Sequence, residues 1–489
     1  MARRKRSKSN KNSRQKNQRK RVPRKEDELR CMLDWLLDDD SIFSKMKLHG
    51  NTKWLPKCLV CLALIWAWSG SKHVTDAFVE SMQLCQSIFG SFVFGTYQGF
   101  MRALSKWTPQ LMEIVWPVLH ERMKEIGTKY WRIDGWVPIA FDGSRSTTPR
   151  TAANEQSFCA KNYGNSNSAK YRRRKTKGMR RKKNEKNKPQ PQGPQTWITL
   201  MWHMGLRLPW MWRLGPSNSS ERAHVMEMIE SGKYPKNTLF CGDAGFVGFP
   251  LWFAIIQSGG AFLVRVGANV SLLRESAGYE LRKKGLVLCW PKDQRATQPP
   301  LRLRLVKVRI GKTKVYVLTN VLDDSKLTPN QMVKFYKMRW GIEVEFRGLK
   351  QTLDRAKLRC RNEQRVLAEL NWSIMAMAVA ELFALKEQLA SRPRKKAEPK
   401  PDPSNRSLAN TMRAIRGCIR RPDSVSQTGE DLATLLRKAV TDNYQRNASK
   451  KARYRPPNPD KKKLGHPKVV TMSAKDKKKL RGTEKKLAA

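Results

Sequence analysis

The stretch Trp136-Val-Pro-Ile-Ala-Phe-Asp142-Gly143 combines an apolar, β-type run with an acidic residue at its end. A similar stretch, Thr238-Leu-Phe-Cys-Gly-Asp243, comes later in the chain. Because α/β sheets usually bind ligands beyond the carboxyl ends of their strands, both stretches predict a strand that presents an Asp. An Asp-Gly pair after a strand is more often a simple turn, and we assign Asp134-Gly135, which looks the same, to a turn.

The segments around these two stretches give the order of elements. Apolar runs and turn residues predict a hairpin between the two Asp stretches, a helix that Ser219 or Ser220 can cap, and another helix after Asp243. The resulting order of strand, strand, strand, helix, strand, helix is typical of an α/β core of the ribonuclease H-like kind. The predicted strands are 136–141, 197–204, 206–214 and 238–241, and the predicted helices are 219–230 and 248–257.

A third acidic residue stands in the segment Tyr336-Lys-Met-Arg339-Trp-Gly-Ile-Glu343-Val-Glu-Phe-Arg-Gly-Leu-Lys350. On a helix that advances about 100° per residue, Tyr336, Arg339, Glu343 and Lys350 fall within a stripe about 60° wide. A carboxylate held between two cations and a phenol suits a metal-bound phosphate. On an arbitrary helix, Glu343 and Lys350 would more often be plain surface charges. The presence of Asp142 and Asp243 in the same chain is what favours a catalytic site.

The three carboxylates Asp142, Asp243 and Glu343 are the candidate catalytic and metal-binding residues. Phosphodiester cleavage and transfer need an activated oxygen nucleophile and a neutralised leaving oxyanion, which two hard cations about 4 Å apart can provide. Such cations prefer oxygen ligands, so two Mg²⁺ or Mn²⁺ ions are expected and no other small-molecule cofactor. The isolated histidines His203 and His224 are expected to be structural.

The charge of the chain names a partner. Its 98 Lys and Arg against 41 Asp and Glu leave a net charge of +57, which favours a nucleic acid nearby. The apolar run Leu59 to Trp68 is shorter than the roughly 20 residues of a membrane span, so no membrane is expected. Cysteines are expected to be reduced core thiols, with a zinc site at Cys58 and Cys61 as the weaker alternative. We therefore expect an intracellular protein.

The motif Tyr-x2-Arg-x3-Glu-x6-Lys, formed by Tyr336, Arg339, Glu343 and Lys350, resembles the signature of bacterial insertion-sequence DDE transposases of the IS-four type. The stretches that end at Asp142-Gly143 and Asp243 resemble the other two catalytic stretches of that family. The resemblance implies a DNA transposase of cut-and-paste type, which cleaves transposon ends and joins the 3′ hydroxyl strands to target DNA. It further implies a homodimer in a synaptic complex with double-stranded DNA, in the bacterial cytoplasm and associated with the nucleoid.

The same resemblance assigns further residues. Tyr336, Arg339 and Lys350 would bind DNA phosphates, as would Arg265 unless it is a plain sheet-edge residue. Some members of the family stack a Trp on a flipped base. Trp290 is the candidate for that role, although an ordinary core Trp is the commoner explanation.

These features together divide the chain. Helical spacing fills the region before Tyr130, period-two spacing follows Ala261, and dense basic runs interrupt or flank the folded parts. The expected units are a basic disordered arm (1–27), a helical N-terminal DNA-binding domain (28–130), the first part of the ribonuclease H-like core with a disordered basic loop at 161–195 (131–260), a β-rich insertion (261–320), the second part of the core with the Glu343 helix (321–390), and a basic, largely disordered C-terminal region (391–489).

Two other functions remain open at this stage. One is a catalytically idle DNA-binding protein descended from a transposase, because intact motifs do not prove activity. The other is a structure-specific DNA endonuclease of the same fold, which would nick DNA without joining strands.

Overall fold

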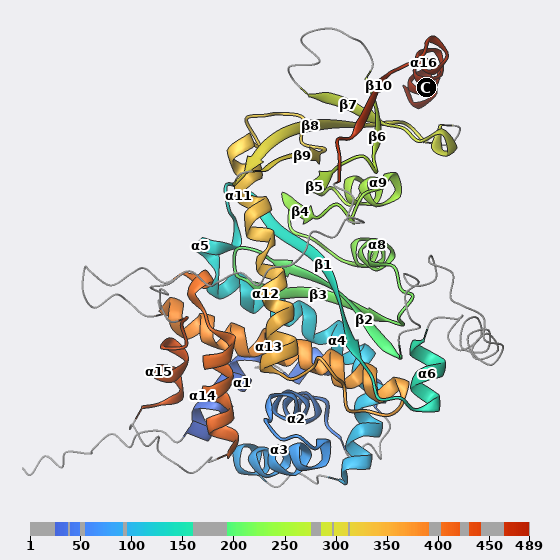
Figure 1. Cartoon of the computed structure of the whole chain (residues 1–489). Coiled ribbons are helices and arrows are strands. Elements are labelled where there is room, and N and C mark those ends of the chain that lie inside the picture. Colours follow the sequence, from blue (N-terminus) through green and yellow to red (C-terminus); the bar gives the residue numbers. More distant parts are fainter. Residues whose placement is uncertain are drawn as a thin grey trace, which may run out of the picture.

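One continuous sheet organises the protein, a mixed α/β structure in the computed structural model (Figure 1). Its ten strands follow the order β10-β6-β7-β8-β9-β5-β4-β1-β2-β3. The structure describes residues 25–37, 40–48, 54–90, 95–159, 193–274, 285–295, 298–311, 313–390, 402–420, 430–441 and 464–488. Residues 161–192 of the expected basic loop at 161–195, and most of the expected basic arm at 1–27, lie outside the described residues.

The strands alternate with helices along most of the chain. The strands are β1 Val137–Thr147, β2 Gln195–His203, β3 Leu208–Gly215, β4 Thr238–Gly242, β5 Ala261–Val266, β6 Ser271–Arg274, β7 Leu286–Cys289, β8 Leu301–Ile310, β9 Thr313–Thr319 and β10 Lys468–Thr471. The helices are α1 Lys25–Leu36, α2 Pro56–Trp68, α3 Val74–Phe89, α4 Tyr97–Ile126, α5 Thr128–Trp131, α6 Ala152–Phe158, α8 Glu221–Ser231, α9 Phe249–Gln257, α11 Pro329–Arg339, α12 Gly341–Arg347, α13 Glu363–Ala390, α14 Leu408–Arg420, α15 Leu432–Arg437 and α16 Ala474–Ala488.

The half of the sheet around β1 has the predicted elements. β1 pairs antiparallel with β2, which forms a hairpin with β3, and β1 pairs in parallel with β4, which in turn pairs in parallel with β5. β4 is buried along its whole length, as its apolar centre Leu239 to Cys241 requires in the middle of the parallel part of the sheet. The helices predicted after the hairpin and after β4 are α8, capped by Ser220, and α9.

The predicted end of the first strand was wrong. β1 does not stop at Asp142-Gly143 but continues to Thr147, and Asp142 through Thr147 pair with Leu200 back to Gln195 on β2. Parallel pairing with β4 does stop just before this point, at Ala140. Sequence patterning missed the continuation because the second half of β1 is polar, and its strand conformation depends on the ladder that β2 provides. Asp134-Gly135, by contrast, is a turn as predicted, with positive φ at both residues.

The half of the sheet beyond β5 is antiparallel. β5 pairs with β9, β9 with β8, β8 with β7 and β7 with β6. The expected insertion began at residue 261, yet β5 is hydrogen-bonded to β4, so no gap in the sheet separates the two halves. The last strand, β10, comes from the C-terminal region and adds to β6 in parallel.

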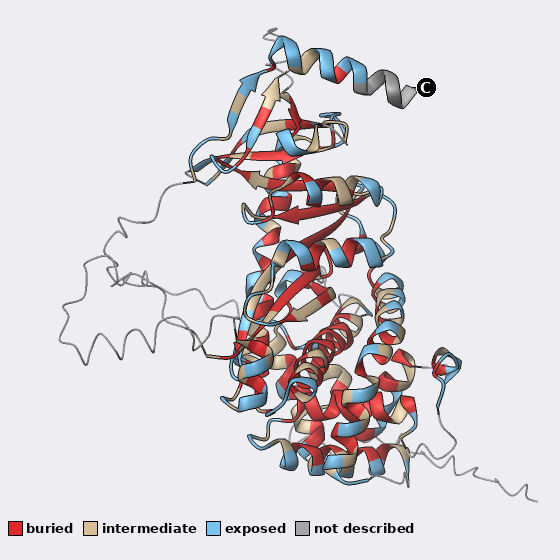
Figure 2. Ribbon diagram, turned by 90° about the vertical axis from the view of Figure 1, so that its right-hand side faces the viewer, coloured by how far each residue is buried: buried red, intermediate tan, exposed pale blue. Residues whose placement is uncertain are grey.

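The helical layer surrounds α13. The helix packs against α2 and α4 from the N-terminal region and against α14 and α15 from the C-terminal region. Hydrogen bonds from the indole N–H of Trp68 to the carbonyl of Ala376 (2.7 Å) and of Trp372 to the hydroxyl of Thr108 (2.8 Å) fix these contacts. Among the described helices, α13 alone is long and apolar enough to cross a membrane, but 89% of its apolar window is buried inside the protein. Figure 2 shows that buried residues fill the interior of the helical layer.

The C-terminal region departs from the expectation of a largely disordered tail. α14 buries Met412, Ile415, Cys418 and Ile419, which recur at helical spacing, against the helical layer. Farther along, Met472 and Leu480 pack on Leu288 and Trp290 of the β-rich half. The basic composition of this region hid these short apolar patterns, which fold only because partners from distant segments cover them.

Candidate active site

The pairing of β1 with β4 places two of the three predicted acidic residues side by side. Ala140 pairs with Cys241, and two residues farther along each strand come Asp142 and Asp243. Neighbouring strands lie about 4.8 Å apart, so the two carboxylates occupy adjacent positions where the parallel pairing ends. Each Asp also orders its own chain, because Asp142 Oδ1 accepts the Gly143 N–H (2.9 Å) and Asp243 Oδ1 accepts the Gly245 N–H (2.7 Å).

Glu343 comes from the helix that crosses this part of the sheet. α12 contacts β1, and Gly341, at the start of α12, lies against the ring of Trp202 on β2. A Cβ at position 341 would stand 2.2 Å from the Trp202 ring, so only glycine allows this close approach. The side chain of Glu343 is exposed, and it lies close enough for its negative charge to act on Asp142.

The charges of the three acidic residues act on one another. Burial raises the pKa of Asp142; the Gly143 N–H and Arg339 oppose this shift, and the negative charges of Asp243 and Glu343 add to it. The structure therefore brings all three predicted carboxylates into one electrostatic environment. The three carboxylates are not in direct contact with a common point, because within the described ranges no three His, Cys, Asp or Glu side chains are close enough to hold a metal ion.

Arg339 is the buried cation of this site. The residue is 3% exposed, and its guanidinium forms a long ion pair with Asp142, with Nη1 3.9 Å from Oδ2. Its Nε finds no hydrogen-bond partner in the described part of the chain. A buried guanidinium with such weak pairing is costly unless an anion completes it. Tyr336, one turn earlier, is also buried and lies beneath the guanidinium, with 5.4 Å from Arg339 Cζ to the ring centre.

Lys350 reaches the site from a distorted helix. The predicted continuous helix is interrupted at Trp340 and turns into a π-helical segment at Gly348–Thr352. Lys350 Nζ nevertheless donates to Ser144 Oγ on β1 (2.7 Å), and burial lowers the pKa of its ammonium. π-Helical turns occur frequently at functional sites, and this one directs Lys350 toward the strand that carries Asp142.

The two remaining predicted residues lie in different settings. Arg265 is half-buried on β5, and the β4–β5 register, which pairs Gly242 with Val264, puts it level with Asp243. Trp290 lies outside the site: it is 2% exposed, it packs with Met472 and Leu480, and its indole N–H donates to the Gln298 carbonyl (2.8 Å). This position matches an ordinary core Trp and leaves no ring face for a base.

Sequence reasoning missed two residues near the carboxylates. Trp340, between Arg339 and Glu343, is 52% exposed, which is unusual for an indole ring. Glu221, the first residue of α8, turns its carboxylate onto Gly143. Trp340 could have been noticed from its place inside the motif, whereas Glu221 gives no sequence signal beyond that of an acidic first helical residue.

The predicted structural role of the histidines agrees with their contacts. The Nδ1 of His203 accepts the Leu206 N–H (3.1 Å), and burial lowers the pKa of this ring to about 3. His224 Nδ1 lies 2.9 Å from the Thr199 hydroxyl.

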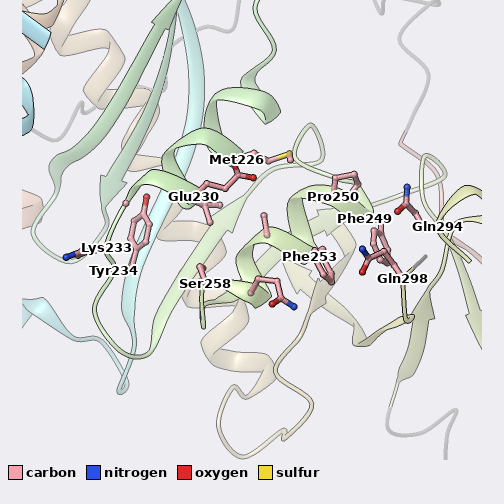
Figure 3. A pocket seen from close by; sticks show the side chains of 14 residues that line it. Met226, Glu230, Lys233, Tyr234, Phe249, Pro250, Phe253, Ser258, Gln294 and Gln298 are labelled. Carbon is pink, nitrogen blue, oxygen red and sulfur yellow. The ribbon is translucent and has the colours of Figure 1, made fainter. Parts of the chain in front are cut away.

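A surface pocket of about 740 Å³ lies away from the carboxylates, between α8 and α9 (Figure 3). Apolar side chains such as Met226 and Phe253 line it together with Gln294 and Gln298. None of the acidic residues described above lines this pocket. The candidate active site is therefore the carboxylate cluster and not the pocket.

Comparisons with known proteins agree with the motif. Residues 139–379 match the family model of the transposase DDE domain. The chain is 28% identical over 165 residues to a Sinorhizobium fredii protein named "Putative transposase y4zB", covering 32% of this chain and 44% of that protein. It is 25% identical over 177 residues to the transposase InsG for insertion sequence element IS4 of Escherichia coli K12, covering 33% of this chain and 37% of that protein. The matched region thus spans less than half the length of these relatives.

One solved structure is also similar. It is the cryo-EM structure of the piggyBac transposase synaptic complex with hairpin DNA, at 12% identity over 86% of this chain and 85% of that one, with a TM-score of 0.35. Its low score gives it no weight in the assignment of fold or function. The family model and the two named relatives confirm the resemblance to DDE transposases of the IS-four type.

Proposed function

We propose that the chain is a DNA transposase of the IS-four type with Asp142, Asp243 and Glu343 as its catalytic carboxylates, because residues 139–379 match the transposase DDE domain and part of the chain is similar to the transposase of IS4. The observation that carries the proposal is that the charges of Asp243 and Glu343 both act on Asp142. The two Asp residues are neighbours through the β1–β4 register, and Glu343 acts on the pKa of Asp142 from α12.

The sheet around the carboxylates supports a ribonuclease H-like core. Its strands run in the order β3-β2-β1-β4-β5, with β2 antiparallel to β1 and with β1, β4 and β5 parallel to one another. In this proposal the helical N-terminal region binds DNA and the antiparallel strands beyond β5 form the inserted part.

The donor set suits hard divalent cations. All three candidate ligands are carboxylates, the oxygen ligands that Mg²⁺ and Mn²⁺ prefer. Burial is the main cause of the raised pKa of Asp142; the Gly143 N–H and Arg339 lower it, and repulsion from Asp243 and Glu343 adds smaller upward shifts. A cation would relieve that repulsion. Two such ions, when bound, supply the activation of an oxygen nucleophile and the neutralisation of the leaving oxygen.

The basic residues have complementary tasks toward the DNA. Arg339 offers a buried guanidinium whose Nε lacks a partner within the described chain, so a phosphate oxygen can complete its hydrogen bonds. Lys350 is held by Ser144 and is placed to neutralise a phosphate close to Asp142. The ring of Tyr336 packs against the guanidinium of Arg339. Arg265, level with Asp243 on the next strand, adds a positive charge on that side of the carboxylates.

An aromatic residue that stacks on a base would be Trp340 rather than Trp290. Trp340 is half exposed beside Glu343, whereas the Trp290 ring is enclosed by the β-rich half and α16. Base–aromatic stacking contributes about 1–3 kcal/mol per base, so an exposed indole at the reacting centre is well suited to hold a displaced nucleotide.

The substrate and assembly follow from the transposase premise. We propose double-stranded DNA with the element's terminal repeats as the substrate, cut-and-paste transfer of the 3′ hydroxyl strands to target DNA, and a homodimer that holds both ends. The large excess of Lys and Arg makes DNA binding weaken steeply with added salt.

The direct test is cleavage of the terminal inverted repeats by Glu343→Gln. This variant keeps the size of the side chain and removes the negative charge, so DNA binding is retained. Nicking in Mg²⁺ falls about a thousandfold or more, since metal catalysis contributes several kcal/mol and each 1.36 kcal/mol is a factor of ten. Asp354→Asn is the matched control, because Asp354 is an exposed acid of the neighbouring segment with φ of 57°, a conformation that Asn tolerates.

Three outcomes would change the proposal. Cleavage retained by Glu343→Gln would remove Glu343 from the site. Nicked DNA without joined products would identify a structure-specific endonuclease. An intact wild-type protein that binds the ends and neither nicks them nor is stabilised by Mg²⁺ would be an idle descendant.

A further inference from the structure

Two arginines from distant segments are hydrogen-bonded to the turn that follows α2. Arg416 of α14 donates through Nε to the carbonyl of Trp68, the last residue of α2 (2.9 Å). Arg359, in the segment between the π-helix and α13, donates through Nη1 to the carbonyl of Ser71 (2.8 Å). A cation at the C-terminus of a helix interacts favourably with the helix dipole, so a single arginine here would need no other explanation.

A third arginine reaches the same turn. Arg420, one helical turn after Arg416, is exposed at the end of α14. A Cβ on Gly70 would lie 3.1 Å from Arg420 Nη2 and 3.6 Å from Arg416 Cδ, so both side chains lie over this exposed glycine. Arg420 forms no hydrogen bond or ion pair with another residue that the structure describes. The turn at Gly70 thus carries one more cation than its carbonyls bind, and we call Arg359, Arg416 and Arg420 the arginine cluster.

Acidic residues do not balance the arginine cluster. Arg359 pairs with Asp354 (3.3 Å), whose side chain is 77% exposed, while Arg416 and Arg420 form no ion pair within the described ranges. Glu80 of α3 also lies at this turn, but its carboxylate accepts hydrogen bonds from the serine hydroxyls there. Burial lowers the pKa of Arg416, the positive charges of Arg420 and Arg359 lower it further, and Asp354 opposes the shift. Gathered like charges lower the stability of the fold unless an anion offsets their repulsion.

The arginine cluster is attached to the segment that carries Lys350. Arg416 Nη2 donates to the carbonyl of Thr352 (3.0 Å), the last residue of the π-helical segment. Lys350, two residues earlier, is held by Ser144 of β1. Figure 1 shows the lower end of α14 beside α2 and α3, below α12. A ligand bound by the cluster therefore lies next to the active site without being part of it.

We infer that the arginine cluster binds a backbone phosphate of double-stranded DNA at a second site, beside the active site. The inference rests on the proposed transposase function, which supplies the polyanion. Guanidinium groups match the geometry of a phosphate and bind it through paired hydrogen bonds. Arg420 has its whole guanidinium free for such a contact among the described residues, and Arg416 uses only Nε and Nη2 for carbonyls. Such a contact positions the duplex and carries no sequence information.

The test is binding of a labelled DNA duplex by the full-length protein, measured by fluorescence anisotropy in EDTA at several NaCl concentrations. One duplex carries a terminal inverted repeat, and a second has the same length and a scrambled sequence. Arg420→Gln is expected to weaken binding to both duplexes about tenfold, the loss of a charge-assisted hydrogen bond. The slope of log affinity against log salt should become shallower by about 0.9, the value for one phosphate contact.

Two further variants serve as controls. Arg420→Lys keeps the charge without the paired donors, so it should keep the wild-type salt slope and lose only part of the affinity. Arg437→Gln removes the same charge from α15, where Arg437 is paired with Glu387 (3.7 Å), and is expected to bind as the wild type does. The unfolding midpoint verifies that each variant folds. For Arg420→Gln it should equal or exceed that of the wild type, since a repelling charge is gone.

Three results would overturn the inference, and they are distinguishable. If the wild type nicks the terminal repeats while Arg420→Gln binds both duplexes with wild-type affinity and salt slope, the arginine cluster is no phosphate site and the proposed function survives. A loss confined to the terminal-repeat duplex would show that Arg420 reads bases instead. If the wild type neither binds the duplexes nor nicks them in Mg²⁺, the proposed function fails and the inference fails with it.

Discussion

The two ends of the sheet treat acidic residues in opposite ways. Around the β1–β4 pairing, the negative charges of Asp243 and Glu343 act on Asp142, whose ion pair with Arg339 is long at 3.9 Å. At the far end, Asp476 of α16 forms an ion pair with Arg295 beside the buried Trp290 cluster. Paired charges can stabilise an interface between segments, whereas clustered charges of one sign lower the stability of the fold. Such clusters are found mainly at functional sites, where a ligand can offset the repulsion. The comparison separates a structural end from a functional end.

The largest expected effect comes from neutralising one acid at each end. Asp243→Asn should reduce DNA cleavage about a thousandfold or more, by the same reasoning as for a lost metal ligand, without lowering the unfolding midpoint. Asp476→Asn should do the reverse: cleavage is kept, and the free energy of unfolding falls by about 1–3 kcal/mol as a charged hydrogen bond is lost. Equal cleavage by the two variants would erase the distinction between the ends.

The second comparison uses the two tryptophans. Trp290→Ala should lower the free energy of unfolding by about 3–5 kcal/mol, as expected for a large side chain removed from a core. Trp340→Ala should change it by no more than about 0.5 kcal/mol, because the ring is half exposed, while reducing transposition. Urea unfolding and a transposition assay measure the two effects. If the Trp290→Ala protein were as stable as the wild type but transposed poorly, Trp290 rather than Trp340 would be the residue that stacks on a base.

A smaller effect is expected for the buried cation. Arg339→Met should weaken end binding or cleavage about 10- to 100-fold, the loss of a charge-assisted hydrogen bond worth about 1.5–3 kcal/mol. The free energy of unfolding should not fall, since Met fills similar space and the unpaired Nε disappears. A large loss of stability would instead mean that Arg339 holds the fold together through Asp142.

The smallest effect is the pH dependence of stability. The pKa of Glu221 rises from 4.5 to about 7 on folding because of burial and of Asp142 and Asp243, so the folded chain holds this proton more tightly than the unfolded chain. The stability that the proton provides is complete below about pH 4.5 and is lost as pH rises through about 7. Wild-type protein should therefore lose more stability than Glu221→Gln between pH 5 and 8, as thermal unfolding would measure. Parallel curves would show that Glu221 does not titrate in this range.

Much of the catalytic half could be predicted from the sequence because its signals are local. The apolar run of β4, the Ser220 cap of α8 and the motif from Tyr336 to Lys350 each lie within one short segment. The missed features depend on partners far away in the chain. β1 continues past Asp142 because β2 pairs with it, and α14 folds because α13 and the N-terminal helices cover it.

The sequence by itself determined the chemistry: which acids, which cations and which motif the chain carries, because residue identity and spacing are local properties. Only the tertiary structure decided which of these groups meet. It joined Asp142 to Asp243 through strand register, enclosed Trp290 while exposing Trp340, and brought Glu221 to Gly143. Such encounters depend on packing between segments far apart in the chain, and no periodicity within one segment encodes them.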